Sequence, residues 1–209
     1  MPRSDLHEAV WKAVPEGGQP PPLANLRLAY LLEHLTPGRR VLDLGCGEGW
    51  FAQQLAQRGI QVVGADVAGE PLRRAHAHHP GLRLELITRE EQWPFAVAEF
   101  DVVWAGEVIE HVADTAAWLS ELRRVLAPEG TLLLSTPAHG LLRRLGLALL
   151  PGAFEAHFDP RSDHLRFYTV SSLRALLHDF RFQEVKIDRA GGIPGARACL
   201  LACARRARF

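Results

Sequence analysis

Residues 41–51, VLDLGCGEGWF, constrain the fold of this chain more than any other stretch. An apolar run that contains Asp43 leads directly into three glycines spaced Gly-x-Gly-x-Gly. Gly45, Gly47 and Gly49 permit tight turns and a close approach of the backbone to another molecule. The pattern predicts a buried strand that ends in a ligand-binding loop, because ligands of open α/β sheets sit at the carboxyl ends of strands.

Apolar segments then alternate between strand and helix patterns. We expect a helix over 114–130 that begins at Asp114 as its N-cap and stops at Pro128-Glu129-Gly130. This rhythm is typical of a mostly parallel sheet with helices on both faces. Strands are expected at 41–45, 60–66, 82–87, 100–105, 131–137, 183–190 and 196–206, and further helices at 5–14, 23–35, 50–59, 69–79 and 170–180.

The length of 209 residues suits one α/β domain. Its expected parts are N-terminal cap helices over 1–36, a Rossmann-like core over 37–137, a lid or substrate-binding insertion over 138–168, and a C-terminal helix and strands over 169–209 that complete the same domain.

Composition narrows the class of protein. Basic and acidic residues number 24 each, so the formal net charge is zero, which argues against a nucleic-acid partner. Three cysteines make a sparse, odd set that suggests a reducing compartment. The N-terminal residues lack the apolar run of a signal peptide, and no stretch approaches the roughly 20 apolar residues of a membrane span. The expected location is cytoplasmic.

A second acidic residue suggests what the glycine loop binds. Asp66 ends the next strand, 17 residues after Gly49, where it could accept hydrogen bonds from a ribose diol. The loop lacks the Gly-x-Gly-x-x-Gly spacing of a dinucleotide site, and Asp43 and Glu48 would repel a pyrophosphate. A cationic nucleoside, S-adenosylmethionine, fits better. A nicotinamide-dependent oxidoreductase and a non-catalytic cofactor-binding regulator or partner protein stay open as alternatives.

These residues resemble a known family. VLDLGCGEGWFA resembles the first motif of class I S-adenosylmethionine-dependent methyltransferases, and the resemblance extends over about residues 24–206. DHLRFYTVSSLRALLHDFRFQEV resembles the C-terminal part of the branch that includes ubiquinone-biosynthesis O-methyltransferases. The resemblance implies a seven-stranded sheet with an antiparallel last strand, and methylation of a small-molecule acceptor on oxygen, nitrogen or carbon. Further matching segments are VVGADVAGEPLRRA, FDVVWAGEVIEHVAD and ELRRVLAPEGTLLLSTP.

The resemblance also implies cofactor contacts for S-adenosylmethionine and its product S-adenosylhomocysteine. Asp43 would engage the ammonium side, and Asp66 would hold both ribose hydroxyls. Thr88 and Glu90 would meet the adenine edge, although Arg89 stands where many relatives have an acid. The remaining contacts would be Gly45, Cys46 and Gly47 at the methionine end, Val67 on the adenine, and Ala105 and Gly106 under the methyl group.

Candidates for the chemistry are fewer. His111 follows the fourth strand and could act as a general base, or it could hold its loop by a backbone hydrogen bond. Glu107 could bind the cofactor or orient the acceptor, and His164 and Tyr168 could contact the acceptor. The four residues His157, Asp159, Asp163 and His164 lack a metal-ligand spacing, so no metal is expected.

The insertion contains LLRRLGLALLPGAF, which is apolar almost all round apart from Arg143 and Arg144. We interpret it as a lid that shapes a lipophilic or aromatic acceptor site. It could instead cap the sheet edge, pack on a second subunit of a homodimer, or touch a membrane surface. A monomer or homodimer is expected.

Overall fold

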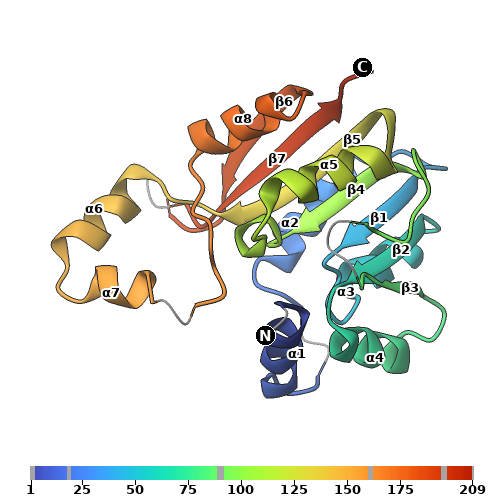
Figure 1. The fold of residues 1–209 in the computed structure, drawn as a ribbon, viewed down its shortest axis with the longest axis horizontal. Coiled ribbons are helices and arrows are strands. Elements are labelled where there is room, and N and C mark those ends of the chain that lie inside the picture. The colour runs from blue at the N-terminus through green and yellow to red at the C-terminus, as the bar shows by residue number, and fades with distance from the viewer. Residues whose placement is uncertain (1–2, 18–19, 89–91, 160–161, 194–196, 209) are drawn as a thin grey trace.

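The computed structural model describes residues 3–17, 20–88, 92–159, 162–193 and 197–208. Seven strands form one sheet in the order β3-β2-β1-β4-β5-β7-β6 (Figure 1). Every neighbouring pair is parallel except the two that contain β7, which runs antiparallel to β5 and β6. The predicted seven-stranded, mostly parallel Rossmann-like sheet is confirmed. The strands are β1 Arg40–Leu44, β2 Gln61–Asp66, β3 Arg83–Leu86, β4 Phe100–Gly106, β5 Leu126–Pro137, β6 Phe182–Ala190 and β7 Cys199–Arg206.

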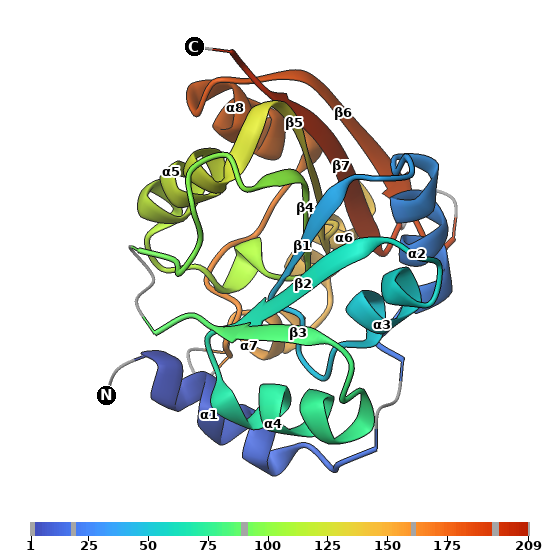
Figure 2. The ribbon, with the colours of Figure 1, turned by 90° about the vertical axis from the view of Figure 1, so that its right-hand side faces the viewer.

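Helices cover both faces of this sheet (Figure 2). Helices α2 (Ala24–Glu33) and α3 (Trp50–Ala56) pack on one face, and α5 (Thr115–Val125) and α8 (Val170–Asp179) pack on the other. Neighbouring strand residues point to opposite faces, so Val41 joins the α2–α3 core while Leu42 joins the α5–α8 core. This double burial explains why the strands read as continuous apolar runs.

Local signals explain the ends of α5. The Asp114 carboxylate accepts a hydrogen bond from the Ala117 amide at 2.9 Å, which confirms the predicted N-cap. The expectation that this helix continues to residue 130 was wrong. The chain leaves the helix at Val125, and the fully buried Leu126 pairs with Phe100 as the start of β5. Pro128 also disfavours a helical conformation at the residue before it.

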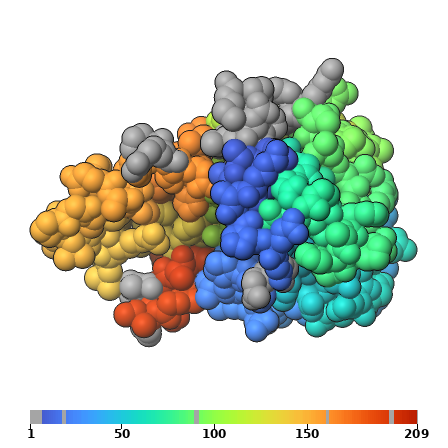
Figure 3. All heavy atoms as spheres, turned by 90° about the horizontal axis from the view of Figure 1, so that it is seen from below, coloured from blue at the N-terminus to red at the C-terminus, as the bar shows by residue number. Residues whose placement is uncertain are grey.

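Peripheral segments differ in how they attach to this core. Helix α1 (Arg3–Ala13) packs against α4 (Gly69–His78), which itself contacts β2 and β3. Helices α6 (Leu141–Leu149) and α7 (Ala153–His157) project from the body of the molecule (Figures 1 and 3). Neither α6 nor α7 contains a buried residue. None of the helices in the described ranges is both long and apolar enough to span a membrane.

Candidate functional site

The glycine loop makes the sharp turn that its sequence predicts. Gly45 and Gly47 have φ angles of 72° and 54°, in the left-handed region that favours glycine. The Gly45 amide donates a hydrogen bond to the Ala65 carbonyl at 2.7 Å, which ties the loop to β2. A side chain at Gly45 would place its Cβ 2.4 Å from the Val108 side chain. Glycine is therefore required here both by the backbone conformation and by lack of space.

Asp43 lies beneath the loop. Its side chain is 2% exposed and accepts a hydrogen bond at 3.0 Å from the Ala52 amide, in the first turn of α3. Burial raises the pKa of Asp43 to about 7, and the neighbouring Asp66 carboxylate acts in the same direction. This residue thus supplies the cap that α3 lacks at its own N-cap, Gly49. A contact with a cofactor ammonium stays a prediction.

Asp66 occupies the end of β2 and faces the loop. One carboxylate oxygen accepts from the Gly47 amide and the other from the Ala68 amide, each at 3.0 Å. Burial raises the pKa of Asp66, although both amides favour the ionised form. The carboxylate therefore holds the glycine loop in place while it also lines the cavity described next.

A cavity of about 290 Å³ opens at the carboxyl ends of β1, β2 and β4. Polar groups from the loop, the end of β2 and the turn after β4 face it, together with aliphatic and aromatic side chains. This mixture suits a small molecule with an apolar body and a few fixed polar groups. The lining residues are His7, Val10, Trp11, Val14, Leu44, Gly45, Asp66, Val67, Ile87, Trp93, Glu107, Val108, His111, Val112, Trp118 and Asp163.

The structure brings some of the predicted cofactor contacts to this cavity and leaves others away from it. Gly45, Asp66 and Val67 line it. Thr88 is exposed and does not line it, and Glu90 lies outside the described residues. The others that do not line the cavity are Asp43 and Cys46, which are buried, Gly47, whose amide binds Asp66, and Ala105 and Gly106 at the end of β4.

Helix α1 covers one side of the cavity, which the sequence did not reveal. His7, Val10, Trp11 and Val14 all line it. The Trp11 ring lies so close to the glycine loop that a Cβ on Gly47 would approach it to 3.0 Å. In the sequence these residues are three or four positions apart, which indicates one face of a helix. This spacing does not reveal what a short amphipathic helix packs against.

Arg74 fastens α1 to the domain. Its guanidinium, 4% exposed, donates to the Trp11 and Val14 carbonyls, each at 2.9 Å. It also pairs with Glu70 at 2.8 Å and with Glu48 at 3.1 Å. The carbonyls at the C-terminus of α1 are therefore satisfied by a buried cation, as the helix dipole favours.

The turn after β4 carries the group best suited to proton transfer. His111 belongs to the short helix η1 (Ile109–His111), and its Nδ1 lies 3.1 Å from the Asp163 carbonyl oxygen. Because a carbonyl oxygen only accepts, Nδ1 must carry the proton, and Nε2 of the neutral ring keeps its lone pair. Burial lowers the pKa of His111, which favours this neutral form, against the nearby Asp163 carboxylate.

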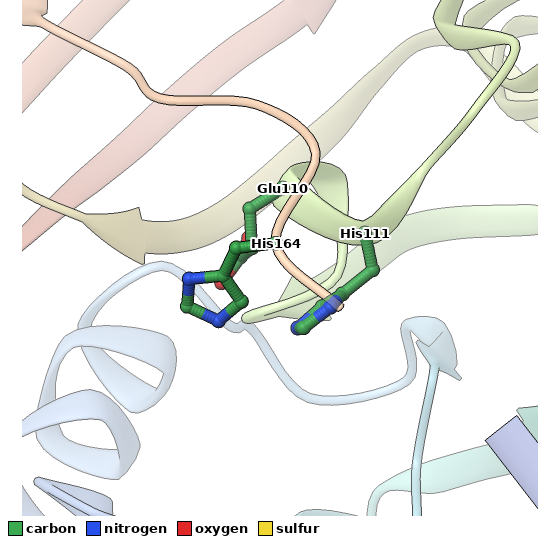
Figure 4. A group of neighbouring side chains, drawn as sticks. All are labelled: Glu110, His111 and His164. Atoms are coloured by element: carbon green, nitrogen blue, oxygen red, sulfur yellow. The ribbon is translucent and has the colours of Figure 1, made fainter. Parts of the chain in front are cut away.

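Glu110 and His164 complete a cluster with His111 (Figure 4). Ligand atoms of the three side chains lie within 4.8 Å of one another, a spacing that one divalent cation could bridge. Burial raises the pKa of Glu110 to about 8, with the Glu107 carboxylate acting in the same direction. The Glu110 backbone carbonyl accepts from the Leu165 and Arg166 amides, so this turn also anchors the segment that brings His164.

Three of the four residues considered as a metal cluster from sequence, namely His157, Asp163 and His164, are divided between two places. His157 lies 3.0 Å from His139 between their Nε2 atoms, whereas His164 stacks edge-on against His111 with 4.7 Å between ring centroids. Asp163 supports His111. The sequence did not single out Glu110 as a site residue, because the pattern around it indicates a buried apolar turn.

Glu107 and Tyr168 have different surroundings. Glu107 has a left-handed φ of 58° and lines the cavity, where Arg27 at 3.0 Å and the Ser135 hydroxyl at 2.9 Å hold its carboxylate. A strained non-glycine conformation of this kind concentrates at functional sites. Tyr168 packs in the α5–α8 core and does not line the cavity, and burial raises its pKa to about 12. Contacts of both residues with an acceptor stay predictions.

Comparison with known proteins agrees with this geometry. Residues 20–187 match the methyltransferase-domain family. The chain belongs to this family. A ubiquinone biosynthesis O-methyltransferase of Cereibacter sphaeroides is 43% identical over 159 residues, which are 74% of this chain and 63% of that protein. The chain thus spans less than two thirds of the length of that relative.

Solved structures show the same fold. A putative methyltransferase of Haloferax volcanii, in complex with the Trm112 methyltransferase activator, superposes with a TM-score of 0.74 at 19% identity, over 99% of this chain and 97% of that one. Phosphoethanolamine N-methyltransferase 2 of Haemonchus contortus, in complex with phosphomonomethylethanolamine and S-adenosylhomocysteine, gives 0.72 at 18% identity, over 99% and 58%. The family's class I methyltransferase fold is therefore present in full.

Proposed function

We propose that this protein transfers a methyl group from S-adenosylmethionine to an oxygen of a small-molecule acceptor. The observation that carries the proposal is that Asp66 and His111 line one cavity, from opposite sides of the glycine loop. Asp66 has the position and hydrogen-bonding capacity to hold a ribose, and His111 has a basic nitrogen fixed by its tautomer. The family match and the O-methyltransferase relatives support the same reaction.

The residues present fit this cofactor. The glycine loop allows close backbone approach, and Asp66 is ionisable, buried and already oriented by two amides. Val67 and Ile87 offer apolar surface beside it for an adenine ring. When bound, the cofactor supplies an electrophilic methyl group on a positively charged sulfur. The Asp66 carboxylate, whose ionised form two amides favour, gives the cavity an acidic group that suits a cation.

The chain's own residues then handle the proton. His111 Nε2 would accept the proton of an acceptor hydroxyl while that oxygen takes the methyl group, the methyl–sulfur bond breaks, and neutral S-adenosylhomocysteine is left. The Asp163 carbonyl keeps Nδ1 protonated, and its carboxylate, 3.4 Å from Nδ1, stabilises the imidazolium that results. Val10 and Trp11 of α1, with Val14 just after it, line this side of the cavity and would limit the access of water to it.

The acceptor we infer is aromatic or otherwise lipophilic. Val108, Val112 and Trp118 give the cavity an apolar wall next to His111. The relative from Cereibacter sphaeroides is named for ubiquinone biosynthesis, and a phenolic hydroxyl on an apolar ring is the acceptor that such a wall and base would suit. An aromatic hydroxyl also loses its proton more readily than an aliphatic one, which matches a histidine base.

The decisive experiment compares His111→Ala with His178→Ala, an exposed histidine at the end of α8. With labelled cofactor and a panel of catechols and hydroquinones, we expect transfer to fall by about 10²–10⁴-fold in His111→Ala and to stay unchanged in the control. Equilibrium binding of the cofactor should change little in either variant. Equal transfer by wild type and His111→Ala would remove His111 from the chemistry.

Three further readouts separate the alternatives. Cofactor binding without transfer to any acceptor would favour a non-catalytic regulator, and tight binding of a nicotinamide dinucleotide would favour an oxidoreductase. Transfer that stops after chelation and returns with Mg²⁺ or Zn²⁺ would show that Glu110, His111 and His164 hold a metal ion in place of the free base.

A further inference from the structure

A second cavity, of about 710 Å³, lies between the start of α6, the N-terminus of α8 and the β6–β7 end of the sheet. It shares no lining residue with the cavity beneath α1. Figure 3 shows the projecting α6–α7 segment with the turn that follows β6 beside it. The lining residues are Ala138, His139, Gly140, Leu141, Arg143, Arg144, Thr169, Val170, Ser171, Arg174, Arg189, Arg197 and Leu200.

The charged side chains that line this cavity are all positive. Five of its lining residues are arginines, drawn from α6, α8 and both sides of the β6–β7 connection, and none is acidic. The chain as a whole has zero formal net charge, so this concentration is a local feature. Five like charges around one cavity repel one another, and an anion placed among them would relieve that repulsion.

Within the described parts of the chain, these five guanidinium groups lack the partners that several other arginines have. Among the described residues, no hydrogen bond or ion pair joins any of the five guanidinium groups to another group. By contrast, Arg27, Arg40 and Arg124 each pair with a carboxylate at 3.2 Å or less. The donors around the second cavity therefore remain available to a ligand.

Two further features shape the cavity. His139, which lines the cavity just before α6, is 5% exposed. Its Nε2 lies 3.0 Å from Nε2 of His157, the last residue of α7, so this contact links α7 to the wall of the cavity. Val170 and Ser171, the first two residues of α8, place the positive end of a ten-residue helix at the same cavity. Charge and shape thus favour an anion with several acceptor oxygens.

We propose that this cavity is a binding site for a phosphate group carried by an anionic ligand. Guanidinium groups present planar pairs of donors that match phosphate oxygens, and several arginines are the usual means of binding one. The phosphate belongs either to a soluble phosphorylated molecule or to a phospholipid headgroup. The site is separate from the cavity assigned to methyl transfer, so its test is independent of that assignment.

The soluble arm uses inorganic pyrophosphate in isothermal titration with the full chain in low-chloride buffer. We expect Arg174→Gln/Arg189→Gln to weaken binding at least about tenfold, because each arginine supplies charge-assisted hydrogen bonds. The matched control is Arg39→Gln/Arg58→Gln, which removes the same charge from exposed arginines with neutral partners. A second test variant, Arg143→Gln/Arg144→Gln, changes α6 alone and repeats the measurement if the first variant folds poorly.

The vesicle arm measures co-sedimentation with vesicles of phosphatidylglycerol in phosphatidylcholine against phosphatidylcholine alone. Binding of pyrophosphate without selective binding of phosphatidylglycerol vesicles supports a soluble ligand, and selective vesicle binding that the test variants lose supports a headgroup. Binding of neither probe, or equal binding by test and control variants, would overturn the site. Unchanged cofactor affinity in the test variants would show that the methyl-transfer cavity is intact.

Discussion

Helix α1 and the α6–α7 segment are both peripheral helical structures, yet they relate to the domain in opposite ways. Three residues of α1 and Val14, which follows it, line the cavity at the glycine loop, and the buried Arg74 binds the Trp11 and Val14 carbonyls. The α6–α7 segment is richer in large apolar residues, but Leu149 is 76% exposed and no residue of either helix is buried. Among the described residues of the range 138–168, Asp163 is the one that lines the cavity.

The difference shows that apolar content does not decide which segment closes a site. The terminal backbone groups of a helix have to be satisfied, and Arg74 of α4 does this for the Trp11 and Val14 carbonyls at the end of α1. Contacts of the α6–α7 segment with the domain include the His139–His157 pair and the packing of the His157 and Phe158 rings on Phe167. A lid role for residues 138–168 stays a prediction, whereas α1 already occupies the position of a cover.

Two deletions give the largest contrast. Removing residues 1–19 should weaken S-adenosylhomocysteine binding about a hundredfold or more, because burial of several apolar side chains against the ligand is lost. Replacing residues 141–157 by a short Gly-Ser linker should leave that affinity within about threefold of wild type. Titration calorimetry on both variants measures the contrast, and the reverse order of effects would make the α6–α7 segment the cover.

Asp66→Ala tests the carboxylate that lines the cavity beneath α1. We expect cofactor affinity to fall by roughly 1–3 kcal/mol, because ribose hydroxyls lose their acceptor and the Gly47 amide loses its partner. Asp188→Ala, on the exposed side of β6, is the control. Unchanged affinity in Asp66→Ala would exclude this carboxylate from the site.

Trp11→Ala and Phe154→Ala compare single aromatic residues of the two segments. Trp11 lines the cavity and Phe154 is 56% exposed on α7. Loss of the buried indole surface should weaken cofactor binding by about tenfold, whereas Phe154→Ala should have no measurable effect. Quenching of tryptophan fluorescence on cofactor addition gives a second readout. This quenching should be smaller in Trp11→Ala than in wild type, because the variant lacks the indole that lines the cavity.

Asp43→Asn should change how stability depends on pH. The folded pKa of Asp43, about 7, lies above its ordinary value of 3.8, so the folded state binds the proton more tightly than the unfolded state. Its stabilising contribution is present below pH 3.8 and is lost as pH rises to about 7. The loss of stability that wild type shows between pH 5 and pH 8 should be smaller in the variant by about 1–3 kcal/mol.

Urea unfolding of the ligand-free protein at both pH values measures this difference. The asparagine keeps an oxygen that can accept from the Ala52 amide, so α3 retains its cap in the variant. Identical pH dependence in wild type and Asp43→Asn would mean that the carboxylate is ionised throughout and that its burial is less complete than the structure shows.

Much of the cofactor side could be predicted from sequence because it depends on neighbours along the chain. The positions of Gly45 and Asp66 follow directly from strand ends, and both strands were recognisable as apolar runs. His111 was placed near them by the order of the strands. Its tautomer could not be predicted, since the Asp163 carbonyl that fixes it lies 52 residues away. Arg74 gave no signal for the same reason.

The sequence by itself determined the sheet, the glycine loop and the acid at the end of β2, because hydrophobic periodicity and glycine conformation act locally. Only the tertiary structure decided which helix covers the cavity, which carboxyl group is buried beside His111, and where five arginines line a second cavity. Those outcomes depend on contacts between distant segments, whose energies arise from burial and charge pairing that appear only when the chain is folded.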